Sequence, residues 1–187
     1  MVATIISIGI LVVILISSAI VINNRIIAKK NTALQAFGSV EIYLKKRFDL
    51  VPNLVALIKQ YMAHEKEILL KATELRSKIE NTGNSEEKIN ASNEFSSLIS
   101  QLNLNVENYP NLKADSQFLN LHHQLTDLED YISASRRAYN ASVTSYNNII
   151  QMFPANIIAG IRKDKIEPLL DIPKTEQKDV NINQLFN

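Results

Sequence analysis

The sequence contains no cysteine and no tryptophan, and only four glycines and five prolines occur among its 187 residues. Without cysteine, disulfide scaffolds, cysteine zinc sites, iron–sulfur clusters and thiol catalysis are excluded. So few chain-breaking residues disfavour a β-sandwich or an α/β sheet, because both need many turns. Basic residues number 20 and acidic residues 19, so the chain lacks the basic excess of a nucleic-acid-binding protein. We therefore expect an all-α protein that binds no nucleic acid.

The chain starts with a long uncharged run. No charged side chain occurs in residues 1–24, and 16 of the 21 residues in Val2–Ile22 are Ala, Val, Ile or Leu. As a helix this run spans roughly 30 Å, the thickness of the hydrocarbon core of a bilayer. A cleaved signal peptide fits less well, because no basic residue precedes the run and the run is too long. Residues 1–24 are therefore expected to form a short external N-terminus and a single transmembrane helix.

The flanking charges predict the orientation of this helix. Arg25, Lys29 and Lys30 follow the apolar run, and only the chain terminus precedes it. Since positive charge is retained in the cytoplasm, we expect the N-terminus outside and the remaining chain inside.

Apolar residues recur at steps of three and four through most of the remaining sequence, which predicts helices over about 25–48, 52–81, 85–106 and 116–152. Short connections between four such helices favour an antiparallel, coiled-coil-like bundle within 25–160. Asp49 is expected to cap the second helix, with Pro52 in its first turn. A kinked continuous helix through Pro52 is the alternative. Asn84, followed by Glu87, is the expected start of the third helix.

Motifs for catalysis or cofactor binding are missing from the sequence. The three histidines have neither the spacing of a helical zinc protease nor that of a di-iron bundle. The phosphate-binding loop, the dinucleotide-binding glycine motif and the nucleophile-elbow motif do not occur. We expect no enzyme activity, no cofactor and no metal site.

Two groups of polar residues fall within the apolar pattern. Glu65 lies on the stripe of the second helix, where a carboxylate is costly unless it is paired. Arg136 or Arg137, near a gap in the stripe of the fourth helix, is the candidate partner. The alternative is that Glu65 leans out to water.

The second group repeats after seven residues, as Tyr139-Asn140 and Tyr146-Asn147, and Phe153 extends the aromatic series by seven more. We interpret these aromatic residues as a row in the core or at an interface. The alternative is that a ligand stacks on this series of aromatic rings.

The segment 153–165 combines an apolar face with basic neighbours, a pattern typical of an interfacial membrane helix. The residues concerned are Phe153, Ile157, Ile158, Ile161, Arg162, Lys163 and Lys165. The alternative is that the apolar residues close the end of the bundle. Residues 161–187 are expected to form a loosely structured tail, in which Ile182, Leu185 and Phe186 form a small apolar cluster.

Several motifs in residues 25–160 resemble the LemA family of bacterial membrane-anchored helical proteins. They are L-K-K-R-F-D-L-V-P-N-L-V at Leu44–Val55, A-H-E at Ala63–Glu65, E-N-Y-P-N-L-K at Glu107–Lys113, and the long block Arg136–Ala159. Residues on these motifs to which the resemblance gives an architectural role are Asp49, Pro52, Asn53, Tyr109, Pro110, Tyr139, Asn140, Tyr146, Asn147, Phe153 and Pro154. The resemblance does not extend over Gly160–Asn187. It implies a single-pass protein of the bacterial inner (cytoplasmic) membrane and does not imply an enzyme.

These observations favour a membrane-anchored, non-catalytic structural or adaptor protein that self-associates or holds a partner. Membrane lipid and a second copy of the chain are the expected partners. The resemblance adds another membrane protein, such as a membrane protease. Ala3 and Ser7 offer a small-residue contact between membrane helices. The alternative is a protein that binds or shapes the membrane surface through residues 153–165, and a helical-bundle enzyme is the least favoured hypothesis.

Overall fold

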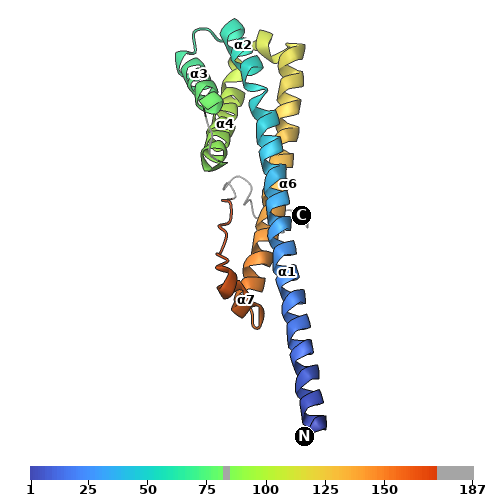
Figure 1. Ribbon diagram of the computed structural model, residues 1–187. Helices are drawn as coiled ribbons and strands as arrows, with labels where there is room; N and C mark the ends of the chain where they lie inside the picture. Colours follow the sequence, from blue (N-terminus) through green and yellow to red (C-terminus); the bar gives the residue numbers. More distant parts are fainter. Residues whose placement is uncertain (82–84, 172–187) are drawn as a thin grey trace, which may run out of the picture. The chain divides into compact units, whose positions relative to one another are not determined.

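The computed structural model describes residues 1–81 and 85–171, and all regular structure in these two ranges is helical (Figure 1). The elements are α1 (Val2–Phe48), α2 (Val51–Tyr61), α3 (Lys66–Asn81), α4 (Ser85–Asn105), the 3-10 turn η1 (Val106–Asn108), α5 (Pro110–Lys113), α6 (Ser116–Gln151) and α7 (Ala155–Arg162). The expected all-α architecture is confirmed.

The chain divides into two compact units. The first contains Met1–Gly38 and Ser135–Asp171, and the second contains, within the described residues, Ser39–Ala134. The long helices α1 and α6 contribute to both units, and each unit is described by itself.

In the second unit, α2, α3 and α4 pack successively on one another (Figure 1). Their apolar faces meet in a core that includes Ile58, Ala72 and Phe95, all fully buried. This burial stabilises helices that would be marginal in isolation, because tertiary packing supplies most of the stability of an amphipathic helix. The apolar residues at three–four steps in the third predicted helix are also buried, namely Ile89, Phe95, Leu98, Leu102 and Val106.

The prediction of one helix over 52–81 is wrong. The chain leaves the helical conformation at Met62, with φ −126° and ψ 35°, and α3 begins only at Lys66. The break folds α3 back onto α2, so that each apolar face buries the other and Met62 is fully buried. Periodicity alone did not reveal the break, because the three–four rhythm continues across it.

At Pro52 the structure lies between the two alternatives. α1 ends at Phe48 and α2 begins at Val51, with a turn of two residues between them. Asp49 does not cap α2: its N-cap is Leu50, which makes no side-chain capping bond. Pro52 stands in the first turn of α2, where its missing N–H costs nothing.

The third and fourth predicted helices are confirmed as α4 and α6, each ending within one residue of its expected position. The proposed cap Asn84 lies outside the described residues. In α6 the gap in the apolar stripe is filled by Ser135 and Arg136, both of which are buried.

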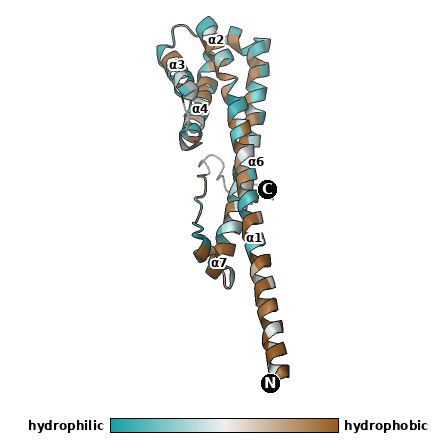
Figure 2. Ribbon diagram, viewed as in Figure 1, coloured by the Kyte–Doolittle hydropathy of each residue, from teal (hydrophilic) through white to brown (hydrophobic). Residues whose placement is uncertain are grey.

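In the first unit, α1 provides a long exposed apolar segment, coloured brown in Figure 2. Among the described residues, α1 has the one stretch that is long and apolar enough to cross a membrane, judged by length and composition. None of that stretch is buried. These properties fit a membrane anchor or a signal sequence.

Beyond the apolar run, α1 packs against the C-terminal half of α6 and against α7. Ile26, Tyr146, Ile150, Ala155 and Ala159 form a buried cluster, with Ile22, Ile149 and Ile158 packed against it. The two alanines lie four residues apart on α7, so this short helix approaches its neighbours closely.

Candidate functional site: an asparagine pair on α6

The feature of the first unit with the most specific chemistry is the repeat Tyr139-Asn140 and Tyr146-Asn147 on α6. Seven residues are nearly two full helical turns, so both asparagines project from one face, roughly 10 Å apart along the axis. Both asparagine side chains are half-buried, while the two tyrosines are buried. This side of α6 therefore presents two half-buried amide groups next to two buried tyrosine side chains.

Residues 163–171, which we call the strap, run along this face in a non-helical conformation. The strap begins where α7 ends in a Schellman motif: Lys163 N–H donates to Gly160 O at 3.2 Å, and Asp164 N–H donates to Ala159 O at 3.0 Å. Lys163 adopts the left-handed conformation that such an ending requires, with φ 58°. The chain is thereby turned back toward α6.

Both asparagines bind the main chain of the strap through paired hydrogen bonds. Asn147 Nδ2 donates to Glu167 O at 2.9 Å, and Glu167 N–H donates to Asn147 Oδ1 at 3.0 Å. Asn140 Nδ2 donates to Leu170 O and Leu170 N–H donates to Asn140 Oδ1, both at 2.9 Å. A side-chain amide carries the same donor and acceptor as a peptide group, so each asparagine pairs with the strap much as a neighbouring β-strand would.

The spacing of the two asparagines along α6 matches the spacing of the two strap residues that they bind. Three residues of extended chain cover roughly 10 Å, which equals seven residues of helix at about 1.5 Å each. Two apolar side chains of the strap contribute little to this contact, since Ile166 is 64% exposed and Leu169 is 55% exposed, whereas Leu170 is half-buried. The α6 face therefore recognises main chain rather than particular side chains.

Tyr139 and Tyr146 have separate environments beneath the strap. Tyr139 Oη donates to Pro168 O at 3.3 Å, and its ring lies 5.3 Å from that of Phe37. Burial raises the pKa of Tyr139, and the Glu167 carboxylate raises it further. Burial also raises the pKa of Tyr146, with the Asp164 carboxylate adding to the effect. Both phenols therefore stay protonated at neutral pH.

A pocket of about 220 Å³ adjoins the asparagine pair. The residues that line it are Lys30, Ala33, Leu34, Phe37, Tyr139, Val143, Tyr146 and Glu167. Its walls from α1 and α6 are mainly apolar, and the strap contributes only Glu167 to the lining. No apolar side chain of the strap fills this space.

The start of the strap is fixed by charge. The Asp164 side chain is 5% exposed, and its carboxylate lies 2.9 Å from Arg162 Nε and 4.0 Å from Lys30 Nζ. Arg162 Nη1 also donates to Asn23 Oδ1 on α1 at 2.7 Å. These contacts join α7, the strap and α1 just beyond the apolar run.

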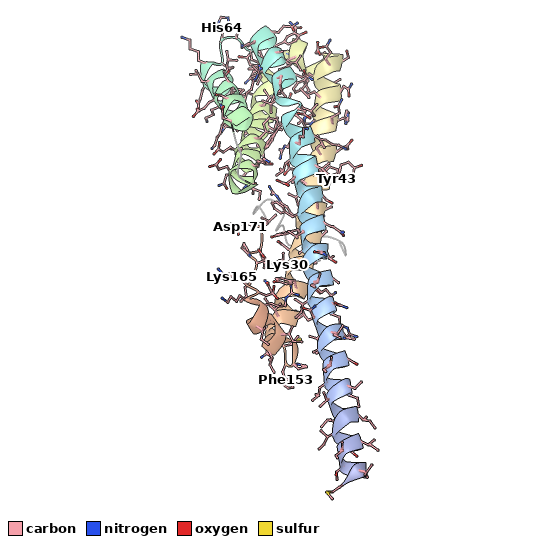
Figure 3. The ribbon with its side chains drawn as sticks, in the orientation of Figure 1. Lys30, Tyr43, His64, Phe153, Lys165 and Asp171 are labelled. Atoms are coloured by element: carbon pink, nitrogen blue, oxygen red, sulfur yellow. The ribbon has the colours of Figure 1, made fainter. Side chains whose placement is uncertain are left out.

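The structure separates the residues predicted to be interfacial. Phe153, Ile157 and Ile161 are 81%, 56% and 78% exposed, whereas Ile158 packs against the buried cluster. Figure 3 labels Phe153 at the turn between α6 and α7, and Lys165 on the strap. Of the three aromatic residues expected to form a row, Tyr139 and Tyr146 are buried and Phe153 is exposed, so Phe153 does not belong to the core and an interface role for it stays a prediction.

Glu65 lies in the turn between α2 and α3, where Tyr109 Oη donates to its Oε1 at 2.7 Å. The Glu65 carboxylate raises the pKa of Tyr109 through this bond. Arg136 and Arg137 belong to the other unit, so pairing of Glu65 with either arginine stays a prediction. Tyr109 is a partner that helical periodicity did not suggest.

The remaining predicted residues are mostly exposed. Arg25 and Lys29 are exposed after the apolar run, and Lys30 is half-buried at the pocket. Asp49, Pro52, Asn53 and Pro110 are exposed at helix ends.

Comparison with known proteins decides the family. The model of the LemA family matches residues 36–183, which is most of the chain. The chain belongs to the LemA family. It is 27% identical over 165 residues to Protein LemA of Metamycoplasma hominis, covering 88% of this chain and 75% of that relative. The match extends past residue 160, where the resemblance seen in the sequence motifs ended, and includes the whole strap.

The sequence missed the roles of Asn140, Asn147 and Asp164. The seven-residue repeat marked both asparagines but was interpreted through its tyrosines. Residues 161–187 were expected to be loosely structured, yet the described part, through Asp171, is fixed to α6 and α1. The apolar cluster of Ile182, Leu185 and Phe186 lies outside the described residues.

Proposed function

We propose that this LemA-family chain is a non-catalytic adaptor held at the cytoplasmic membrane by α1 and by the exposed apolar face of α7. The observation that supports the proposal is the position of α7. It packs on α1 at Ile22 and Ile26, and Arg162 binds Asn23, two residues before the first charged residue, Arg25. When Val2–Ile22 spans the hydrocarbon core, α7 therefore lies at the level of the headgroups.

The exposed side chains of α7 suit that level. Ile157 and Ile161 lie four residues apart on α7, with Phe153 preceding them, and burial of each in lipid is worth about 1.5–3 kcal/mol. Lys163 and Lys165 are exposed beside them. Attraction of such cations to anionic headgroups is worth about 1 kcal/mol each. Together they make α7 a second membrane contact that fixes the helical body against the surface.

The proposed topology has the N-terminus outside and the chain after the apolar run in the cytoplasm, as the basic residues that follow the run favour. Self-association through the membrane helices is part of the same adaptor hypothesis. Ser7 Oγ donates to Ala3 O within the helix at 2.9 Å, which leaves both residues compact enough for a close helix contact.

The natural absence of tryptophan allows a clean test of α7 in the full chain. The variant F153W, reconstituted in phosphatidylglycerol–phosphatidylcholine vesicles, should give blue-shifted emission that lipids brominated near the headgroup quench strongly. The matched control is L119W, because Leu119 is 45% exposed on the N-terminal half of α6. We expect little quenching of L119W. Equal quenching of the two variants would refute the interfacial role of α7.

A further inference from the structure

The asparagine pair and the adjoining pocket together have the properties of a peptide-binding site. Four hydrogen bonds link Asn140 and Asn147 to the main chain of residues 167 and 170, at distances between 2.9 and 3.0 Å. Extended peptides commonly bind proteins through such main-chain pairing, with pockets for alternate side chains supplying specificity. Here the main-chain pairing is satisfied by the strap, but the pocket receives no apolar side chain.

We infer that this face of α6 is a binding site for an extended segment of a partner protein, with an apolar residue at the position that Glu167 occupies in the strap. The partner segment pairs its main chain with Asn140 and Asn147 in place of the strap. Its apolar side chain enters the pocket between Ala33, Phe37 and Val143. The strap is then a placeholder that covers the site until the partner displaces it.

One observation allows a different segment to occupy the site, and two further observations favour such a segment over the strap. The contacts to both asparagines involve only main-chain atoms of the bound segment, so they place no demand on its side chains. Ile166 and Leu169 of the strap remain mostly exposed and only Leu170 is half-buried, so much of the strap's apolar surface is not used in the contact. Glu167 adds a carboxylate to a pocket whose other walls are mainly apolar.

The inference deepens the proposed adaptor role and rests on it, but it does not depend on membrane contact by α7. Peptide binding and lipid quenching are measured separately. Failure of the vesicle experiment with F153W leaves peptide binding untouched. Loss of peptide binding leaves the position of α7 untouched.

The strap can be released by removing its main-chain donors. In the full-length variant E167P/L170P, neither residue keeps the N–H that donates to Asn147 or Asn140. A second variant, D164A, releases the strap differently, by removing the carboxylate that binds Arg162. Helical content measured by circular dichroism checks that each variant is folded, and agreement between the two guards against an effect of proline alone.

The probes are two fluorescent peptides, with the sequence of residues 163–171, K-D-K-I-E-P-L-L-D, and with its glutamate replaced by leucine. Anisotropy is measured with detergent-solubilised full-length protein. We expect both released variants to bind the first peptide saturably and the unmodified chain to bind it at least about tenfold more weakly, because the strap competes. Burial of a leucine side chain should make the second peptide bind roughly tenfold tighter or more.

The control adds N140A/N147A to the released variants, and we expect saturable binding of both peptides to disappear. Absence of binding by the released variants, or equal binding with and without the asparagines, would overturn the inference. Equal affinity for the two peptides would overturn the assignment of the pocket. If sedimentation instead shows that the released variants form dimers that the first peptide dissociates, the occupant is the strap of a second copy and the partner assignment is wrong.

Discussion

The ion pair between Arg47 and Glu129 offers the sharpest test of how the second unit is held together. The Arg47 side chain is 3% exposed, and its Nη1 lies 2.6 Å from Glu129 Oε2. Nη1 also donates to Ser92 Oγ at 3.1 Å, and Nη2 donates to Ser96 Oγ at 3.0 Å. The guanidinium lies 4.8 Å from the centre of the Phe95 ring. A buried cation at the end of α1 is thus joined to α4 and α6.

Removing Glu129 and removing Arg47 should lower the free energy of unfolding by different amounts, because the two side chains differ in burial. Removing one partner of a buried ion pair typically costs about 3–5 kcal/mol, since the other charge is left uncompensated. Glu129 is 35% exposed, and two serine hydroxyls remain beside Arg47. We therefore expect E129A to lower the free energy of unfolding by about 2–3 kcal/mol, below the usual range because solvent partly screens the pair.

Replacing the other partner of the ion pair, Arg47, should lower the free energy of unfolding by less. In R47M the methionine keeps apolar contact with Phe95, and the Glu129 carboxylate can turn toward water. We expect a loss of about 1–2 kcal/mol for R47M, and nearly the same for R47M/E129A, because the neutral side chain has no charge to leave unpaired. The double variant should thus be more stable than E129A alone.

The assay is urea unfolding of the full chain in detergent, followed by far-ultraviolet circular dichroism. E107A is the matched control, because Glu107 forms an exposed pair with Lys113, with side chains 67% and 54% exposed. Its expected effect is within about 0.5 kcal/mol. A loss for R47M larger than that for E129A, or an E129A variant as stable as the control, would refute the reasoning.

Two further predictions concern carboxylates at helix ends. Asp115 Oδ1 accepts hydrogen bonds from the N–H groups of Gln117 and Phe118, and Oδ2 accepts one from Tyr61 Oη. The bond from Phe118, followed by that from Tyr61, lowers the pKa of Asp115 in the folded state. The ionised Asp115 therefore stabilises the fold above the unfolded pKa of about 3.9, and this effect is lost as the pH falls through the folded pKa. We expect the stability of D115N to depend less on pH in acid than that of the unmodified chain. Equal slopes of the urea midpoint against pH for the two proteins would contradict this. The second is that D164A should be cleaved by trypsin severalfold faster after Lys163 than the unmodified chain, because Asp164 no longer holds the strap. Mass spectrometry identifies the cleavage site, and unchanged cleavage would contradict the role of Asp164 in holding the strap.

The sequence predicted well those features that depend on local pattern. The uncharged run in α1, the limits of α4 and α6, and most of the buried stripe of α6 follow from composition and from the period of apolar residues. These signals are short-range, because a helix places its neighbours at fixed steps of three and four. The LemA resemblance followed in the same way, from continuous blocks of residues.

The break between α2 and α3 could not be predicted from local pattern. The three–four spacing continues across the break, with Glu65 in place of an apolar residue, yet the chain turns there because α3 buries its face on α2. The partner of Glu65 was missed for the same reason, since Tyr109 is 44 positions away.

The sequence by itself determined that this protein is helical, that its first helix is apolar enough to cross a membrane, and that Tyr139-Asn140 and Tyr146-Asn147 share one helical face. Only the tertiary structure decided what that face does. The groups that Asn140 and Asn147 bind are peptide N–H and C=O groups 30 and 20 positions further along the chain. Because every residue carries a main-chain carbonyl, no side-chain pattern marks which of them will be bound, and the pairing becomes visible only when the chain has folded back on α6.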